Sequence, residues 1–397
     1  MLLSIILYDL AMLIIMSTFA AKSEIMTKIL LAIDSFKGCL SSSEVEEAVA
    51  KAILMKGESY EILKIPVSDG GEGMLEAFCH AINGEIRNVR VHDPLMRVVS
   101  SSSYGVSSDH KIAIIEMARA SGLMFLDHSE LNPMLTTSYG TGELIADAIL
   151  HGSRNFIIGL GGSATCDGGT GMMQALGVRF FDSDHHELMY GGAILPDIKE
   201  LDISQVNPLL SKCTFTIAAD VFNPLCGDMG AAKIFAPQKG ATAAMVDSLE
   251  KGLHNYSEIV NFFLHKDVNV VSAGAAGGLG ASLIGFMNAK VCSGTDLLLK
   301  LINFDRLLSD SDLVITGEGR ADRQTLMGKL PFGILQAGKR QKKPVYLMAG
   351  NVEDLSELSN AGFEKIIAIT PDGMPLSQAM EKDVAIKNIV KAVGQLL

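Results

Sequence analysis

The chain has 397 residues, a formal net charge of −12, 48% hydrophobic residues and 20% charged residues. This length exceeds one ordinary hydrophobic core, so we expect two domains, and the composition excludes an extended disordered protein. The acidic balance without a basic stripe excludes a duplex nucleic-acid binder. An anionic ligand must therefore be attracted locally, by a few cations, dipoles or a metal.

Residues 1–25 form an apolar segment that is interrupted by Asp9. No cation precedes this segment and a charge lies inside it, so a secretory signal and a membrane helix both fit poorly. Because Met26 leads directly into a strand pattern, we expect it to be the functional start, with a real anchor or signal as the alternative. The cysteines include no C-x-x-C pair, which predicts reduced, mostly buried thiols in a cytoplasmic protein. We do not expect the protein to bind a membrane.

Short apolar runs alternate with helical patterns from Met26 onward. Strands are expected at 29–34, 61–68, 86–92, 112–118, 156–161, 215–220, 312–317, 345–349 and 366–370. Helices are expected at 43–57, 72–82, 141–151, 170–176, 244–265, 322–339 and 376–396. The first of these helices has a capping-box start, in which serines 41–43 are followed by Glu46.

This alternation predicts the α/β class with a parallel, doubly wound sheet. Paired runs near 86–118 are less regular and predict an antiparallel portion. The first strand groups best with the C-terminal strands, so we expect one α/β domain from residues 26–65 and 295–397. Residues 66–294 then form a large inserted α/β domain.

Four predicted strand ends share one design, an acidic residue beside a glycine-rich turn. The acids are Asp34, Asp69, Asp220 and Glu318. Each alone could cap the following helix. Ligands of open α/β sheets bind beyond the carboxyl ends of the strands, however, so four such ends predict a shared acidic cleft. Clustered carboxylates repel one another unless a metal or a proton relieves them, and Mg²⁺ with a nucleotide is the natural occupant.

The densest glycine cluster, GLGGSATCDGGTG at 159–171, follows a strand and precedes a helix. Its backbone N–H groups and the helix start suit a phosphate or a carboxylate. Ser163 and Thr165 add hydroxyl donors, and Asp167 can hold a metal or accept a proton. The alternative interpretation is a tight crossover that needs close packing.

The same cluster also matches a relaxed dinucleotide fingerprint, Gly-x-Gly-x-x-Ala at 159–164, with Asp182 near the position of a ribose-binding acid. An NAD-dependent dehydrogenase of a small hydroxy acid is therefore the alternative enzyme, and a non-catalytic binding protein is the third hypothesis. The sequence has neither a Walker motif nor a G-x-S-x-G elbow. The cations best placed to meet an anion are Lys37, Lys239 and Arg320.

Eight motifs occur in the same order as in the glycerate kinase family, a bacterial type unrelated to Walker or protein kinases. They are DSFKG (34–38), SDGGEG (68–73), TTSYGTGEL (136–144), GGSATCDGG (161–169), DVFNPLCG (220–227), FAPQKGA (235–241), AGAAGGLG (273–280) and TGEGRAD (316–322). The resemblance covers about residues 27–396. It implies ATP- and Mg²⁺-dependent phosphorylation of D-glycerate, in a cleft between a Rossmann-like domain and an inserted one. Cys166 departs from the pattern, because similar family members often carry asparagine there.

Phosphoryl transfer needs alignment of the acceptor hydroxyl and neutralisation of charge more than covalent chemistry. We hypothesise that Asp220 or Asp69 accepts the proton of the glycerate hydroxyl. Lys37 and Arg320 would neutralise the phosphates or hold the substrate carboxylate. We favour 2-phosphoglycerate over 3-phosphoglycerate as the product.

The remaining predicted site residues bind the metal or the ligands. Mg²⁺ is assigned to Asp34, Asp167 and Glu318. The predicted substrate- and phosphate-binding residues are Ser35, Gly70, Gly71, Gly161, Gly162, Ser163, Thr165, Asn223 and Lys239. Glycerate and the nucleotide are the expected partners, without nucleic acid, and the sequence leaves the oligomeric state open, a homodimer included.

Overall fold

The computed structural model describes residues 26–396 apart from 58, 69 and 72. The apolar segment 1–25 and the predicted catalytic Asp69 therefore lie outside the described residues. Within the described part, the helices are all too short or too polar to cross a membrane.

The first sheet contains five parallel strands in the order β13-β12-β11-β1-β2. Their bounds are β1 Thr27–Ile33, β2 Tyr60–Lys64, β11 Leu313–Ala321, β12 Val345–Val352 and β13 Lys365–Ala368. The sheet thus joins the start of the described chain to its end. In a doubly wound sheet, ligands bind at the switch point, which is the place where the order of the strands reverses. In this sheet the switch point lies between β1 and β11.

Strand β1 is apolar on both faces because helices cover both. Ile29, Leu31 and Ile33 pack in one buried cluster with α2 (Ser42–Leu54) and α15 (Lys382–Leu396). Leu30 and Ala32 belong to a second cluster with α10 (Gly294–Leu301), α11 (Phe304–Ser309) and α12 (Leu330–Gln341). Each large side chain buried in this way contributes roughly 1.5–3 kcal/mol. The predicted α/β class with a parallel sheet is confirmed.

Helix α2 begins at Ser42, one residue before the expected start at 43, and its capping box uses a different glutamate. Ser41 is the N-cap, and Glu44 rather than Glu46 completes the capping box. The Glu44 side chain accepts from the Ser41 N–H at 2.8 Å. Glu46 instead turns inward and is only 1% exposed. The prediction that Glu46 completes the capping box was wrong. The N-cap is Ser41 and not Ser43, because Ser41 takes the extended backbone that an N-cap requires.

The second sheet contains six strands in the order β10-β9-β6-β5-β4-β3. Their bounds are β3 Glu85–His92, β4 Val98–Val106, β5 Ile112–Glu116, β6 Asn155–Gly159, β9 Thr214–Ala218 and β10 Lys290–Cys292. Strands β3, β4 and β5 pair antiparallel, which confirms the antiparallel portion expected near 86–118. The other neighbours pair parallel.

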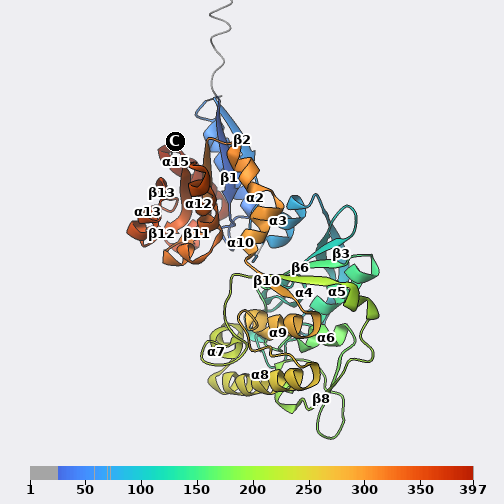
Figure 1. The fold of residues 1–397 in the computed structure, drawn as a ribbon. Coiled ribbons are helices and arrows are strands. Elements are labelled where there is room, and N and C mark those ends of the chain that lie inside the picture. Colours follow the sequence, from blue (N-terminus) through green and yellow to red (C-terminus); the bar gives the residue numbers. More distant parts are fainter. Residues whose placement is uncertain (1–25, 58, 69, 72, 397) are drawn as a thin grey trace, which may run out of the picture.

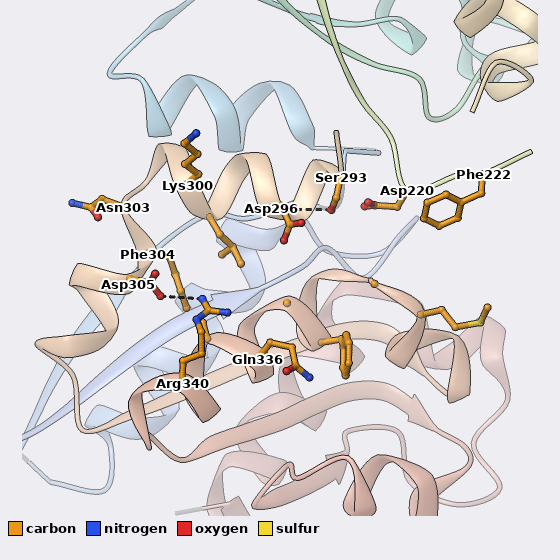
Figure 2. Close-up of a pocket in the computed structure, with 16 residues that line it drawn as sticks. Asp220, Phe222, Ser293, Asp296, Lys300, Asn303, Phe304, Asp305, Gln336 and Arg340 are labelled. Carbon is orange, nitrogen blue, oxygen red and sulfur yellow. Dashed lines mark hydrogen bonds and ion pairs between the residues drawn. The ribbon is translucent and has the colours of Figure 1, made fainter. Parts of the chain in front are cut away.

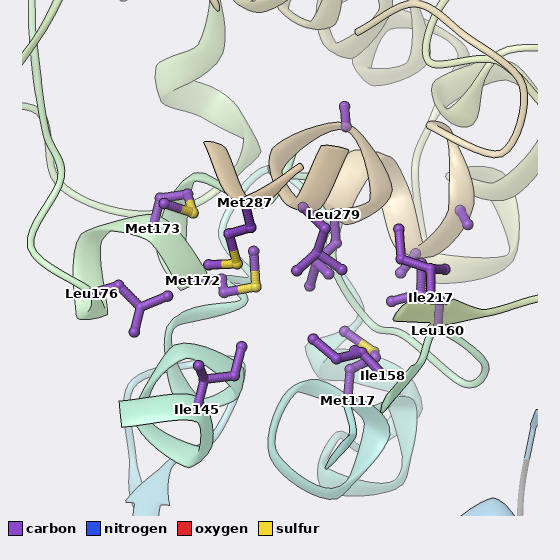
Figure 3. Close-up of a cluster of buried hydrophobic side chains, with 14 of the residues drawn as sticks. Met117, Ile145, Ile158, Leu160, Met172, Met173, Leu176, Ile217, Leu279 and Met287 are labelled. Carbon is purple, nitrogen blue, oxygen red and sulfur yellow. The ribbon is translucent and has the colours of Figure 1, made fainter. Parts of the chain in front are cut away.

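Helices and a small hairpin complete the second region. The helices are α3 Met74–Ala81, α4 Ala118–Ser121, α5 Tyr139–Leu150, α6 Thr170–Ala175, α7 Ala231–Phe235, α8 Ala243–Leu264 and α9 Ala275–Met287; the hairpin pairs β7 Arg179–Phe181 with β8 Glu200–Asp202. Figure 3 shows Met172 and Met173 of α6 beside Met287 of α9, in the same buried cluster as Leu279 of α9 and Ile158 of β6. Both α6 methionines are buried.

Two helices expected near the C-terminus are each interrupted. The 322–339 segment forms a 3₁₀ turn, Arg323–Met327, and then α12. Gly328, with φ 105°, ends the turn, and Pro331 lies in the first turn of α12, where its missing N–H costs no hydrogen bond. The 376–396 segment splits into α14 (Leu376–Ala379) and α15; the short α13 (Leu355–Asn360) was not predicted.

The two sheets draw on different parts of the chain (Figure 1). The first uses strands from 27–64 and 313–368, and the second uses strands from 85–292. Helices α3 and α10 pack against each other where the two parts meet. The predicted domain boundaries at 65/66 and 294/295 stay predictions.

Candidate active site

The carboxyl ends of β1 and β11 bring two predicted acids into one cavity. Ile33 pairs with Gly317 in the sheet register, so Asp34 and Glu318 follow on neighbouring strands. Both are buried, at 4% and 7% exposure. They line a cavity of about 650 Å³ with Ser35, Lys37 and Arg320. We call it the strand-end cavity; it lies at the switch point of the sheet, where ligands bind in this architecture.

A lysine that the sequence analysis missed also lines this cavity. Lys329 donates to Glu318 Oε2 at 3.0 Å, while Thr325 Oγ1 donates to Glu318 Oε1 at 2.6 Å. Lys329 is the N-cap residue of α12. It went unnoticed because the segment was read as one continuous helix, although Gly328 directly before it is a signal for a helix break.

The strand-end cavity suits a hard cation. Its two carboxylates offer oxygen ligands, which Mg²⁺ prefers. Ser35 Oγ is buried and has no hydrogen-bond partner among the residues that the structure describes. Such an oxygen calls for an unseen water or ion. The residues present therefore fit Mg²⁺ bound by one or two carboxylates.

A second cavity, of about 340 Å³, collects most of the other predicted residues. We call it the central cavity. The predicted residues that line it are Lys37, Gly70, Gly71, Gly161, Gly162, Ser163, Asp220 and Lys239. Lys37 and Lys329 line both cavities, so the two adjoin at these lysines. The structure thus brings together cations and acids from both sheets.

One wall of the central cavity is the loop 161–163, which follows β6. The N–H groups of these three residues donate to no acceptor among the described residues. Gly162 has φ 73°, a left-handed conformation that glycine adopts without strain. Successive N–H groups in such a turn form a concave site for an anion.

Lys239 supports this loop from behind. Its Nζ donates to Ser163 Oγ at 2.6 Å and to the Thr165 carbonyl oxygen at 2.7 Å. Burial lowers the pKa of Lys239 to about 8, so the side chain keeps most of its charge at pH 7. Thr165 itself is buried, and its carbonyl oxygen is the second acceptor of Lys239. Burial also raises the pKa of Cys166 to about 12, which leaves a neutral thiol at this position.

Asp167 is not brought to the other predicted metal ligands. Its carboxylate is fully buried and accepts from Ser138 N and Oγ, Thr137 Oγ1, Gly169 N and Gly171 N, at 2.8–3.4 Å. Five donors saturate the two oxygens. Asp167 therefore holds the start of α6 in place, and its prediction as a metal ligand has no support in the structure.

Two further predicted residues are engaged elsewhere. Arg320 lines the strand-end cavity, but its guanidinium contacts Glu353 at 2.7 Å and Asp322 at 3.5 Å. Asn223 Nδ2 donates to the Met229 carbonyl at 2.8 Å and shapes the loop after β9. These contacts do not favour Asn223 as a ligand-binding residue.

Asp220 links the central cavity to a third cavity of about 500 Å³. In Figure 2, Asp220 and Phe222 enter from the loop after β9, with Asp296 of α10 to their left and Gln336 of α12 below. Phe222 is exposed at the rim. Asp220 is therefore accessible from both the central cavity and the third cavity.

The dinucleotide fingerprint lacks its structural context. Strand β7, which ends before Asp182, pairs antiparallel with β8 and is not a neighbour of β6. Helix α6 begins only at Thr170, well after the glycines. A dinucleotide site requires a parallel βαβ unit around these glycines. The dehydrogenase alternative therefore loses its support.

Comparisons with known proteins agree with this site. The model of the Glycerate kinase family matches residues 29–397. A curated Glycerate 2-kinase from Escherichia coli (strain K12) is 42% identical over 367 residues, which are 92% of this chain and 96% of that protein. A curated Glycerate kinase from Halalkalibacterium halodurans is 40% identical over 361 residues, 90% of this chain and 94% of the relative.

A crystal structure described as a glycerate kinase 2 from Salmonella typhimurium LT2 is 39% identical, with a TM-score of 0.78. The match covers 94% of this chain and 100% of the chain in that crystal structure. These matches define the protein class as a small-molecule kinase. The parallel sheet and the strand-end cavity, which is lined by lysines and carboxylates, agree with this class. The chain belongs to the Glycerate kinase family.

Proposed function

We propose that this chain transfers a phosphoryl group from ATP to D-glycerate with Mg²⁺, and that 2-phosphoglycerate is the favoured product. Family membership supports the reaction, and the name of the Escherichia coli relative supports the position. The observation that carries the proposal is the pair Lys37 and Lys329, which stand between a carboxylate cavity and an anion-binding loop. The cytoplasmic location and the oligomeric state stay predictions.

The nucleotide is assigned to the strand-end cavity. It is lined by Lys37 and Lys329 and also by apolar side chains that include Ile369 and Met380. A site with apolar walls and a few polar groups is typical of nucleotides and cofactors. The lysines would bind the phosphates, and the apolar side chains would contact the base.

Asp34, Glu318 and the Ser35 hydroxyl, which line the same cavity as the two lysines, would hold Mg²⁺. When bound, the cation would supply charge neutralisation on the phosphate oxygens. The contacts of Lys329 and Thr325 to Glu318 would keep that carboxylate in a single orientation. Fixed orientation matters because a misplaced reacting group costs a large part of the rate.

Glycerate is assigned to the central cavity. Its carboxylate would accept from the N–H groups of the 161–163 loop, with the charge of Lys239 directly behind. Charge-assisted hydrogen bonds of this kind contribute roughly 1.5–3 kcal/mol each. Asp220 would then accept the proton of the hydroxyl that attacks the phosphoryl group. Asp69 lies outside the described residues, so mutagenesis must distinguish the two acids.

The test is release of ADP that depends on D-glycerate. Purified protein with ATP and Mg²⁺ should release ADP only when glycerate is added, and ³¹P NMR should identify 2-phosphoglycerate as the product. Nucleotide binding without turnover would instead support a non-catalytic binding protein. A product phosphorylated only at the 3-hydroxyl would contradict the proposed position but not the kinase.

A further inference from the structure

Three residues outside the cleft bring metal-binding atoms together. Cys226 lies in the loop between β9 and α7, whereas Glu250 and His254 lie one turn apart on α8. One ligand atom from each is within 4.8 Å of the others. In the described part of the chain, this is the one group of its kind. It shares no residue with the strand-end cavity, where Mg²⁺ is proposed.

The group contains polar atoms that the protein leaves unpaired. Glu250 Oε2 is buried and has no hydrogen-bond partner among the described residues. Cys226 is only 3% exposed, and its thiol likewise makes no hydrogen bond to the residues that the structure describes. A buried carboxylate oxygen without a partner destabilises the folded protein, because it has lost its hydrogen bonds to water. Such a group calls for an explanation, and an unseen ion is one.

The separations suit a tetrahedral cation. With bonds of about 2.0–2.3 Å, the ligand atoms around zinc lie roughly 3.3–3.8 Å apart. His254 Nε2 and Glu250 Oε1 are already 3.4 Å apart. Since all three atoms lie within 4.8 Å, the cysteine needs to move by at most roughly 1 Å. Thiolate, imidazole and carboxylate are the ligand types that zinc takes in proteins.

Neighbouring groups hold two of the ligands in orientation. The Gly227 N–H donates to Glu250 Oε1 at 2.6 Å, and the Cys226 N–H donates to Asn269 Oδ1 at 2.9 Å. Such outer contacts are a regular feature of metal sites and tune their affinity. The His254 side chain is 56% exposed, so a cation can enter from solvent on that side.

We propose that Cys226, Glu250 and His254 form a site for one divalent cation of the zinc class, with a fourth position open to water. On binding, the thiol proton passes to solvent and the sulfur bonds to the cation, so that thiolate and carboxylate together balance the two positive charges. The cation would tie the loop that begins at Asp220 to α8. This site stands independently of the proposed kinase reaction.

Cobalt(II) is the probe, because a thiolate ligand gives a near-ultraviolet charge-transfer band and tetrahedral geometry gives intense visible bands. The full chain, reduced and treated with a chelator that is then removed, should bind one equivalent of Co²⁺ and show both signals. Added Zn²⁺ should abolish them by displacement. Cys226→Ser should lose the charge-transfer band, and His254→Ala should weaken binding by at least about tenfold.

The surface position of His254 keeps the test informative if Cys226→Ser fails to fold. Cys292→Ser is the matched control, since Cys292 is an exposed cysteine outside the group, and it should keep both signals. His254→Ala should also keep wild-type ADP release, which separates this site from the cleft. The proposal is overturned if the wild type gives no charge-transfer band, if binding is only millimolar, or if His254→Ala binds as tightly as the wild type.

Discussion

Glu46→Gln should stabilise the protein at neutral pH, because it removes a buried carboxyl group that must take up a proton on folding. Glu46 packs beneath the end of β1, where its Oε1 accepts from the Ile33 N–H at 3.3 Å. Burial raises the pKa of Glu46 to about 8, although the N–H groups of Ile33 and Ile65 and the charge of Lys64 act in the opposite direction. Glutamine keeps the volume and an acceptor oxygen but carries no charge.

The sign and size follow from linkage. The folded-state pKa of about 8 lies above the ordinary value of 4.5, so the folded protein binds more protons than the unfolded chain between these values. The stability contributed by the protonated Glu46 is complete below pH 4.5 and is lost as the pH rises towards 8. At about 1.4 kcal/mol per pH unit, the loss between pH 5 and pH 7 is about 3 kcal/mol. That is a large share of a typical folding free energy.

Urea unfolding at pH 5, 6 and 7 measures this directly. The difference in unfolding free energy between Glu46→Gln and wild type should grow by about 3 kcal/mol over the range. Glu47→Gln is the matched control on the same helix, because Glu47 is exposed and pairs with Lys51 and Lys64. Those pairs lower the pKa of Glu47, so its variant should show a small change of opposite sign. Parallel pH curves for wild type and Glu46→Gln would refute the reasoning.

The remaining predictions concern the cleft. Asp220→Asn should lower kcat by roughly 10²–10⁴-fold at unchanged thermal stability, and near-wild-type kinetics would transfer the role of base to Asp69. Lys329→Met should lower kcat/KM by roughly 10²-fold, whereas Lys342→Met at the far end of α12 should match the wild type; equal losses in both would argue against a specific role. Because burial lowers the pKa of Lys239 to about 8, its charge is lost above that pH, and KM for glycerate should rise between pH 7.5 and 9. In Lys239→Met, KM should be high throughout and nearly independent of pH, and a wild-type profile in this variant would exclude the lysine.

Local patterns in the sequence predicted the strands and the residues at their ends. The run ILLAID predicts β1 because a strand covered on both faces must be apolar throughout. The chain direction in a parallel sheet then places Asp34 and Glu318 at the same edge. The 161–163 loop was likewise found from glycines that follow a strand, and Lys239 from its charge in the motif FAPQKGA. Their roles in catalysis stay predictions.

Other features depended on contacts between distant segments. Lys329 contacts Glu318 across 11 positions of sequence, and Glu46 accepts from the Ile33 N–H across 13. Asp167 likewise depends on a distant segment, because Ser138 donates to its carboxylate together with the nearby N–H groups of Gly169 and Gly171.

The sequence by itself determined the α/β class, the strand ends and the family, because these depend on residues that lie close together in the chain. The tertiary structure alone decided which acids share a cavity, and it brought Cys226 to Glu250 and His254 across 24 and 28 positions of sequence. Side-chain proximity of that kind is set by packing of α8 against the loop after β9, and no periodicity or local propensity in the chain encodes it.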